Sequence, residues 1–407
     1  MPMQKRTFST AVLAVLVITA TDIQAAPPAA KPKAPAAYDP WSYHAEIGIG
    51  FDSNVYRSPS DPYRDYAKTI PPTVTPNVQS GFFVPLEGDI KYQGRHGKDR
   101  IGFVAHLSLD ADIYPGSKIE NANKISLALW TGAEILLGRG GRKNNTLSVL
   151  PYLKQHQQTY VDRDDGLEKT TTVTRTDISN RYSYIARGLE AELKIETPVV
   201  PFKLWAEAAD RNYDDPVVVD QYDHRYIALG GEAEIPLGKR VELIASLEHQ
   251  VKDYDERRAI DLNGNLVTGT TREYLYNIGG LSLRTRFNKT WTMYLDYKHT
   301  DREDTYVGYY DSSEDKFGVR LRFNSDPVSV RLAVHMLDRD YPNAYAFDNT
   351  TQPHLEYQTL EFKAKGEYKL ARHLGLWMEA KYWDQETTDS RYAYDRYQMM
   401  LGVRWES

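Results

Sequence analysis

Charged residues in this chain recur at every second position of short segments, opposite apolar residues. In the segment 360–368, for example, Leu360 and Phe362 alternate with Glu361 and Lys363. Because successive side chains of a β-strand point to opposite faces, such a segment has one apolar face and one ionic face. Ionic side chains gathered on one face can attract charged solutes and orient polar ones. The first chemistry that the residues suggest is therefore recognition of a polar solute.

The sign of these alternating charges changes along the chain. The acidic positions of the earlier segments are Glu46, Glu87, Asp89, Asp110, Asp112, Glu134, Glu190, Glu192, Glu207, Glu232, Glu234, Glu242 and Glu248. The basic positions of the later segments are Arg284, Arg286, Lys298, Arg320, Arg322, Arg331, Lys363, Lys365, Lys381, Arg396 and Arg404. If the segments close into a barrel, these sets predict an acidic wall opposite a basic wall. In a hydrated lumen the charges of the two walls would act on solutes. In a filled lumen they would instead form ion pairs across the interior, and each exposed pair would contribute about 0–1 kcal/mol of stability. We expect a hydrated lumen.

Six aromatic residues fall on the same polar face. They are Trp130, Tyr152, Trp205, Tyr294, Trp377 and Trp383. Sugars have apolar ring faces bordered by hydroxyl groups, so aromatic rings beside carboxylates suit a carbohydrate. A β-bulge would instead move any single ring to the membrane interface. As a set, these rings favour a saccharide cargo.

Two loop segments look like sites for metal binding or catalysis, and neither has the full pattern. The segment 261–265 begins like a calcium-binding loop, but Gly264 stands one position early and Arg272 takes the place of the bidentate Glu. Asn263-Gly264 and Asp165-Gly166 instead predict hairpin turns. The 10 His are scattered, and no segment joins a nucleophile to a base. We expect no catalytic residues, no metal site and no cofactor.

Alternating faces require β-strands, and sixteen segments can supply them. The predicted strands are 41–53, 80–92, 99–113, 123–136, 146–159, 180–196, 202–213, 223–236, 240–254, 272–287, 290–303, 313–324, 327–340, 356–369, 373–385 and 391–406. Short connections alternate with longer polar ones, as in outer-membrane β-barrels with short periplasmic turns and longer external loops. The predicted fold class is an all-β, transmembrane antiparallel β-barrel of about sixteen strands. A soluble sandwich or propeller is the alternative, but it rarely shows this alternation of loop lengths.

Composition agrees with a barrel of this kind. With 41% hydrophobic residues, 26% charged residues and a mean hydropathy of -0.58, the chain is too polar for helical membrane spans. Its 30 Tyr and 7 Trp argue against disorder. A net charge of -6 gives no reason to expect nucleic acid as a partner. The absence of Cys excludes disulfides, thiolate metal sites and a lipid anchor on an N-terminal cysteine.

The N-terminal segment has the features of a secretory signal peptide. Lys5 and Arg6 precede the apolar run 11–20, which is shorter than the ~20 residues that a membrane-spanning helix needs. Small residues follow around Ala25. We therefore predict three parts of the chain: a signal peptide at 1–25, an Ala/Pro-rich periplasmic lead-in at 26–40 and an outer-membrane barrel at 41–407.

Two segments resemble known outer-membrane proteins. The last strand is similar to a C-terminal assembly signal in having Tyr397, Met399, Leu401, Val403 and Trp405 on one face, although Glu406 and Ser407 follow. The segment 47–59, IGIGFDSNVYRSP, resembles the start of the outer-membrane β-barrels encoded with exopolysaccharide biosynthesis genes. It is similar, more weakly, to the barrels of surface lipoprotein assembly modifiers. Here no tetratricopeptide-like helical repeat precedes the barrel, so the resemblance implies that any periplasmic scaffold is a separate protein.

The same segment also predicts local contacts from its residue types. Asp52 and Asn54 at a strand end can form turns between their side chains and the backbone. Arg57 could reach either a carboxylate in the lumen or a phosphate of lipopolysaccharide.

Together, the sequence predicts an outer-membrane channel for a polar, carbohydrate-type cargo, and the resemblance implies export of an exopolysaccharide. A general diffusion porin for small polar solutes and a surface-assembly or adhesion barrel stay open as alternatives. Expected partners are outer-membrane lipid and lipopolysaccharide, the polysaccharide or solute, and a separate periplasmic scaffold or export complex. We expect the mature protein in the Gram-negative outer membrane.

Overall fold

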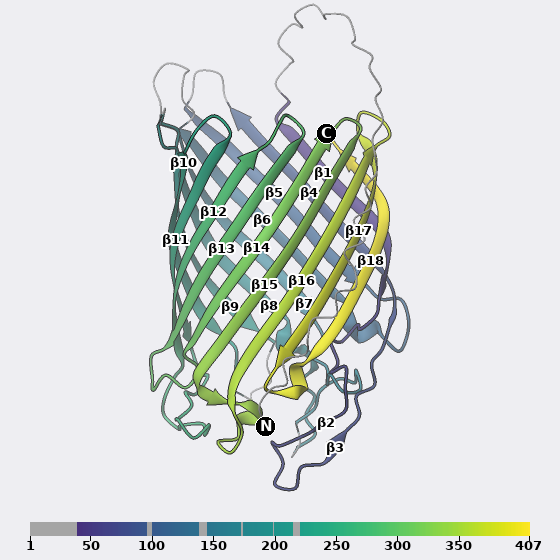
Figure 1. Ribbon diagram of the computed structural model, residues 1–407. Coiled ribbons are helices and arrows are strands. Elements are labelled where there is room, and N and C mark those ends of the chain that lie inside the picture. Colours follow the sequence, from purple (N-terminus) through teal and green to yellow (C-terminus); the bar gives the residue numbers. More distant parts are fainter. Residues whose placement is uncertain (1–38, 96–99, 138–144, 172–173, 198, 215–219) are drawn as a thin grey trace, which may run out of the picture. The chain divides into compact units, whose positions relative to one another are not determined.

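The described chain folds as a closed antiparallel β-barrel of sixteen strands (Figure 1). This computed structural model describes residues 39–95, 100–137, 145–171, 174–197, 199–214 and 220–407, and Pro40–Ser407 forms one compact unit. The barrel strands are β1 (Trp41–Asp52), β4 (Gly81–Arg95), β5 (Ile101–Ile113), β6 (Lys124–Leu136), β7 (Thr146–Gln158), β8 (Tyr184–Ile195), β9 (Phe202–Tyr213), β10 (His224–Pro236), β11 (Val241–Tyr254), β12 (Glu273–Arg286), β13 (Trp291–Asp304), β14 (Ser312–Ser325), β15 (Val328–Tyr345), β16 (His354–Lys369), β17 (Leu374–Thr387) and β18 (Tyr394–Glu406). The predicted fold class is confirmed.

The barrel closes because its first and last strands pair along most of their length. The register runs from His44 opposite Glu406 to Asp52 opposite Gln398. The other barrel strands pair with their neighbours in chain order. Closure leaves no free sheet edge in the wall, so each backbone polar group there can find a partner. Within the described residues, no helix is long and apolar enough to cross a membrane.

Short turns and long loops lie at opposite ends of the barrel, as predicted. Figure 1 shows the C-terminus at the short-turn end and the strands β2 and β3 at the long-loop end. β2 (Tyr63–Arg64) and β3 (Thr73–Val74) form a separate two-stranded sheet within the first long loop. The long-loop end also holds four short turns of 3-10 helix. They are η1 (Glu120–Ala122), η2 (Ser179–Tyr182), η3 (Ala346–Asp348) and η4 (Ser390–Tyr392).

Some predicted boundaries are wrong. β8 begins at Tyr184 rather than at 180, because residues 179–182 coil into η2. β15 continues past 340 to Tyr345, since its pairing with β16 resumes after a register shift. β4 continues to Arg95, past the predicted end at 92. The predicted signal peptide at 1–25 and the lead-in up to 38 lie outside the described residues.

The outward face of the barrel carries an apolar belt near the short turns. On β18 its residues are Tyr397, Met399, Leu401, Val403 and Trp405, which are between 42% and 67% exposed. Outward positions of the other strands are likewise large, apolar and exposed. An apolar surface that surrounds a whole barrel is unstable in water and suits the hydrocarbon of a bilayer. We therefore expect lipid to cover this belt.

Leu401→Arg should destabilise the folded barrel in lipid by about 2–4 kcal/mol, because a guanidinium at the middle of the belt would face hydrocarbon. Asp384→Arg provides the matched control on the outward face of β17, nearer the long loops. It is expected to cost only about 0–1 kcal/mol, as for positions near the interface. Urea titrations of the barrel in lipid vesicles measure both values. Equal costs for the two variants would contradict a membrane at the level of Leu401.

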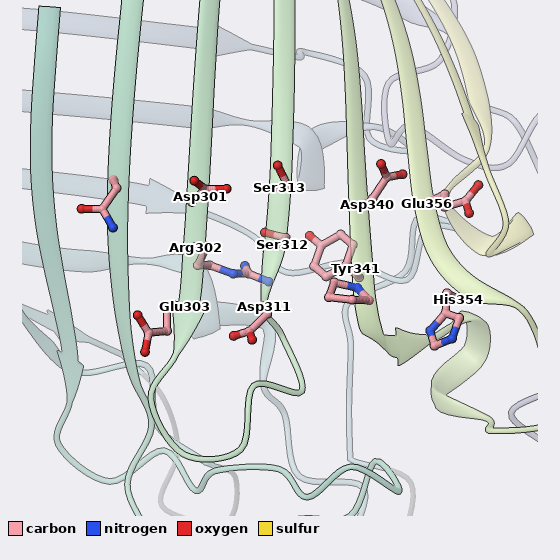
Figure 2. Close-up of a pocket in the computed structure, with 12 residues that line it drawn as sticks. Asp301, Arg302, Glu303, Asp311, Ser312, Ser313, Asp340, Tyr341, His354 and Glu356 are labelled. Atoms are coloured by element: carbon pink, nitrogen blue, oxygen red, sulfur yellow. The ribbon is translucent and has the colours of Figure 1, made fainter.

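Outward carboxylates lie beyond the belt, toward the long loops. Asp301 on β13, Asp340 on β15 and Glu356 on β16 line a cavity of about 570 Å³ at this level. Figure 2 shows these acids on both sides of β14, with Arg302 and Tyr341 extending toward each other between them. The guanidinium of Arg302 lies 5.2 Å from the centre of the Tyr341 ring. Because carboxylates avoid hydrocarbon, this rim marks the outer border of the apolar belt.

Candidate functional site

The pairing register places every predicted charged and aromatic lumen residue on one face of the wall. Glu46 stands opposite Glu87 on one side and Arg404 on the other, and Glu87 stands opposite Asp110. The same face continues around the remaining strand pairs. Lys365 Nζ lies 2.8 Å from a Glu46 carboxylate oxygen although β17 and β18 separate their strands. This face therefore points into the barrel.

Water reaches the inward face. The side chains of Glu87, Arg331 and Lys363 are 53%, 47% and 52% exposed, although they point into the barrel. A barrel of about sixteen strands encloses an aqueous channel unless something fills it. Exposed inward charges on both walls therefore indicate a hydrated lumen at their level.

Most cations of the basic wall are paired with carboxylates, and three of these, Asp296, Glu367 and Glu379, were not counted in the sequence analysis. Ion pairs join Arg284 to Glu242, Arg320 to Asp296, Arg331 to Glu367, Lys363 and Lys381 to Glu379, Lys365 to Glu46, and Arg404 to Glu367. Arg286 lies 4.0 Å from Glu242, while Lys298 and Arg322 have no carboxylate at ion-pairing distance within the described residues. Local pairing of this kind weakens the field that an uninterrupted basic wall would produce across the lumen.

On the acidic wall, by contrast, carboxylates accept hydrogen bonds from aromatic side chains. The donor and acceptor pairs are Trp130 Nε1 to Glu190 at 3.0 Å, Tyr152 Oη to Glu207 at 2.6 Å, and Trp205 Nε1 to Glu248 at 3.1 Å. The same pairing recurs on the basic wall, where Trp383 Nε1 donates to Glu361 at 2.8 Å. Tyr294 has a cation instead, with Arg320 4.5 Å from its ring centre. A ring beside an ionic group is therefore a repeated unit of this lumen.

Trp205 shows how such a ring is held. A Cβ atom at Gly230 would come within 2.3 Å of the indole, so the ring lies flat against the backbone of β10. Lys203 lies 5.1 Å from the ring centre. Only glycine permits this close approach of the half-buried indole.

Trp377 faces inward as expected but is not open to the lumen. It is only 5% exposed and belongs to a buried cluster that includes Phe83 and Met400. Its Nε1 donates to the carbonyl oxygen of Val403 at 3.2 Å, and Lys365 Nζ lies 5.2 Å from its ring centre. A Cβ atom at Gly48 would come within 2.8 Å of the indole, a close approach that the alternation of side chains cannot show. Trp377 is therefore removed from the set of rings that a solute can contact.

The segment 47–59, which carries the family resemblance, closes the barrel at the long-loop end. Asp52 is fully buried and accepts hydrogen bonds from Arg396 Nε at 3.0 Å, Gln398 Nε2 at 2.8 Å and Tyr114 Oη at 2.8 Å. Arg396 and Gln398 belong to β18, so these bonds join the last strand to the first. A buried, fully hydrogen-bonded ion pair thus lies on the closing seam.

The predicted turns of this segment are confirmed. Asp52 Oδ1 accepts a hydrogen bond from the backbone N–H of Asn54 at 3.0 Å. Asn54 then accepts from the N–H of Ser58 at 2.8 Å and donates to its carbonyl oxygen at 2.8 Å. Arg57, at the tip of this turn, has a φ of 55° and lines a cavity inside the barrel. Its guanidinium is therefore not placed to meet lipopolysaccharide.

Residues 60–79 of the first long loop, which we call the cap segment, cross the mouth of the barrel. Tyr63 Oη donates to Asp164 in the β7–β8 loop at 2.8 Å. The Tyr63 and Tyr66 rings both lie beside the Phe347 ring in the β15–β16 loop, at 6.4 and 5.5 Å. These two loops are halfway round the sixteen-strand ring from each other. Burial raises the pKa of the Tyr63 hydroxyl, so it stays a donor at neutral pH. The cap segment thus covers the long-loop end of the lumen.

A set of cations near the long-loop end was missed by the sequence analysis. It comprises Arg211, Lys252, Arg257, Arg272 and Arg302. Within the described residues none of them has a carboxylate at ion-pairing distance, and all lie over tyrosine rings. Alternation places Arg211, Lys252 and Arg302 on the inward face and could have identified them. Arg257 and Arg272 lie in a loop, where no alternation applies.

One cluster of potential metal ligands lies on the inward face. His44 Nε2 is 3.4 Å from Glu46 Oε1 and 4.0 Å from Glu87 Oε1. The carboxylate of Glu46 already accepts hydrogen bonds from Lys365 Nζ at 2.9 and 2.8 Å. Because that ammonium group neutralises the central carboxylate, we assign no metal to this cluster.

The loop segments that look like metal or catalytic sites form turns, as predicted. Gly264 has a φ of 85°, and residues Ile260 and Leu266 pair across it. Asp261 Oδ1 accepts the N–H groups of Asn263 and Asn265, both at 2.9 Å. The carboxylate therefore stabilises its own turn.

Comparison with known proteins yields distant structural neighbours only. No family model and no curated protein matches this chain. OmpT, an outer membrane protein of Vibrio cholerae, has a TM-score of 0.42 and 10% identity, with 91% of this chain and 99% of that chain covered. A triple mutant of Rhodopseudomonas blastica porin has a TM-score of 0.37 and 10% identity, with 90% and 99% covered. These similarities are too distant to assign a function.

Proposed function

We propose that this protein is an outer-membrane channel for a polar, carbohydrate-type cargo. The observation that carries the proposal is the repeated pairing of a partly exposed aromatic ring with a carboxylate on the inward face, at Trp130, Trp205 and Trp383. Indole rings offer flat apolar surfaces to the C–H faces of sugars. The neighbouring carboxylates can accept hydrogen bonds from sugar hydroxyls. Several such units along a hydrated lumen suit a chain of sugar residues.

Export of an exopolysaccharide is the direction that we favour. The segment 47–59 supports it through its resemblance to barrels encoded with exopolysaccharide genes. The cap segment is also consistent with a passage that opens only when cargo or a partner complex is present. General diffusion of small polar solutes is the second candidate, and the exposed inward charges favour it.

Loss of two lumen rings should weaken saccharide binding. The double variant Trp205→Ala/Trp383→Ala is expected to bind maltohexaose about tenfold more weakly, because each ring contributes on the order of 0.7 kcal/mol of stacking. Interruption of single-channel current by maltohexaose in planar bilayers measures this affinity. Trp291→Ala removes an outward ring and should leave the affinity unchanged. A double variant that binds as well as the unmodified protein would contradict the role of the rings.

The direction of transport is tested in cells. A strain without this gene should lose secreted polysaccharide and regain it when the gene is restored. Unchanged secretion would overturn export and leave the diffusion channel as the function.

A further inference from the structure

A cavity of about 430 Å³ lies inside the barrel at the long-loop end. Arg57 and Arg163 reach it from two loops, and β14–β18 together with the β17–β18 loop supply the remaining wall. Aromatic side chains form much of that wall, among them Tyr341, Tyr357 and Tyr392. The cavity therefore combines flat rings with guanidinium groups that come from two different loops and from the barrel wall.

The two loop arginines lack an anionic partner. Within the described residues, neither Arg57 nor Arg163 has a carboxylate at ion-pairing distance, while Arg163 lies 5.1 Å from the Tyr392 ring centre. Burial and the positive charges of Arg396 and Arg163 lower the pKa of Arg57, against the opposing effects of Tyr394 and Asp52. Two like charges held in one cavity repel each other. An anion placed between them would remove that cost and gain charge-assisted hydrogen bonds.

The other charged groups of the cavity are already satisfied. Arg339 is paired with Glu314, and Lys316 Nζ lies 3.2 Å from Glu361. Glu361 also accepts the indole N–H of Trp383. Of the charged groups in this cavity, the two loop arginines are therefore the ones that can bind an anion.

We propose that this cavity binds the acidic group of a saccharide residue, so that the cargo is an acidic rather than a neutral polysaccharide. The proposal rests on the proposed function and narrows its substrate class. The tyrosine rings suit the faces of sugar rings, and guanidinium groups recognise carboxylates with two parallel hydrogen bonds. Its place inside the barrel separates it from membrane lipid phosphates.

The surrounding mouth has the same chemistry. Arg211, Lys252 and Arg302 project inward from β9, β11 and β13 without a carboxylate partner in the described part of the chain, each over a tyrosine ring. These cations extend the positive region from the cavity around the long-loop end. A polyanionic chain passing this level would meet cations on several strands.

Paired ligands of equal length test the proposal. Hexagalacturonate and maltohexaose are added to the full barrel in planar bilayers, and each dissociation constant is taken from current interruptions. The unmodified protein should bind hexagalacturonate at least about tenfold more tightly. The preference should shrink in about 1 M salt, where charges are strongly screened. Arg57→Gln/Arg163→Gln should abolish the preference while maltohexaose binding stays unchanged, which also shows that the variant is folded.

A single outward substitution controls for net charge. Arg225→Gln removes an exposed outward guanidinium 3.8 Å from Asp210 and should keep the preference. Equal binding of the two ligands by the unmodified protein, or a preference that survives in the double variant, would overturn the acidic-saccharide site but not the channel. Failure of both ligands to bind would overturn the proposed function together with this site.

Discussion

Asp52→Ala should lower the free energy of unfolding of the barrel by about 3–5 kcal/mol. The substitution leaves Arg396 buried without its counter-charge, and Gln398 and Tyr114 lose their shared acceptor. Two of these partners, Arg396 and Gln398, tie β18 to β1 at the long-loop end. Destabilisation at this position therefore acts on the closure of the barrel. Urea titration in lipid vesicles measures it.

Two further variants separate closure from a general loss of charge. Asp210→Ala breaks an exposed outward ion pair with Arg225 and should cost about 0–1 kcal/mol. Asp52→Leu/Arg396→Met removes both buried charges and should recover much of the lost stability, because an apolar pair needs no desolvation of ions. A value for Asp52→Ala within about 1 kcal/mol of the unmodified protein would contradict a stabilising role for the buried pair.

Replacing residues 61–76 with a short Gly/Ser linker should raise the single-channel conductance several-fold. These residues include β2, β3 and both tyrosines that bridge the mouth. Ions that enter from the long-loop end must pass the cap segment, so its removal widens the path there. The sixteen barrel strands and the Asp52 network are untouched, and the variant should therefore fold.

A smaller change tests the same contact. Tyr63→Phe removes the hydrogen bond to Asp164 but keeps the ring. The channel of this variant should be open for a smaller fraction of the time than the channel of the linker variant. If the linker variant conducts no better than the unmodified protein, the cap segment does not limit the pore.

The fold was predictable because a barrel wall has a simple period. Each strand alternates one lipid-facing with one lumen-facing side chain, so positions such as Leu360 and Lys363 carry their orientation in the sequence. Strand ends were less predictable. The residues predicted to begin β8 form a 3-10 turn, and β15 extends past its predicted end at 340. Loop contacts rather than alternation decide where strand pairing stops.

The lumen residues were predictable as a face but not as a site. Alternation placed Glu190 and Trp130 inward, yet it could not show that one donates to the other. It could not show that Trp377 is buried in a cluster that also contains Val55 and Tyr56, because those two residues come from a loop. For the same reason the cavity containing Arg57 and Arg163 required the folded loops.

The most direct test of a saccharide passage is permeation of sugars into lipid vesicles that contain the full barrel. The vesicles should swell in isosmotic solutions of oligosaccharides, and faster when residues 61–76 are replaced by the linker. Vesicles that swell in neither case, although the barrel is folded in their membrane, would show that the lumen is closed to saccharides and would contradict the proposed function.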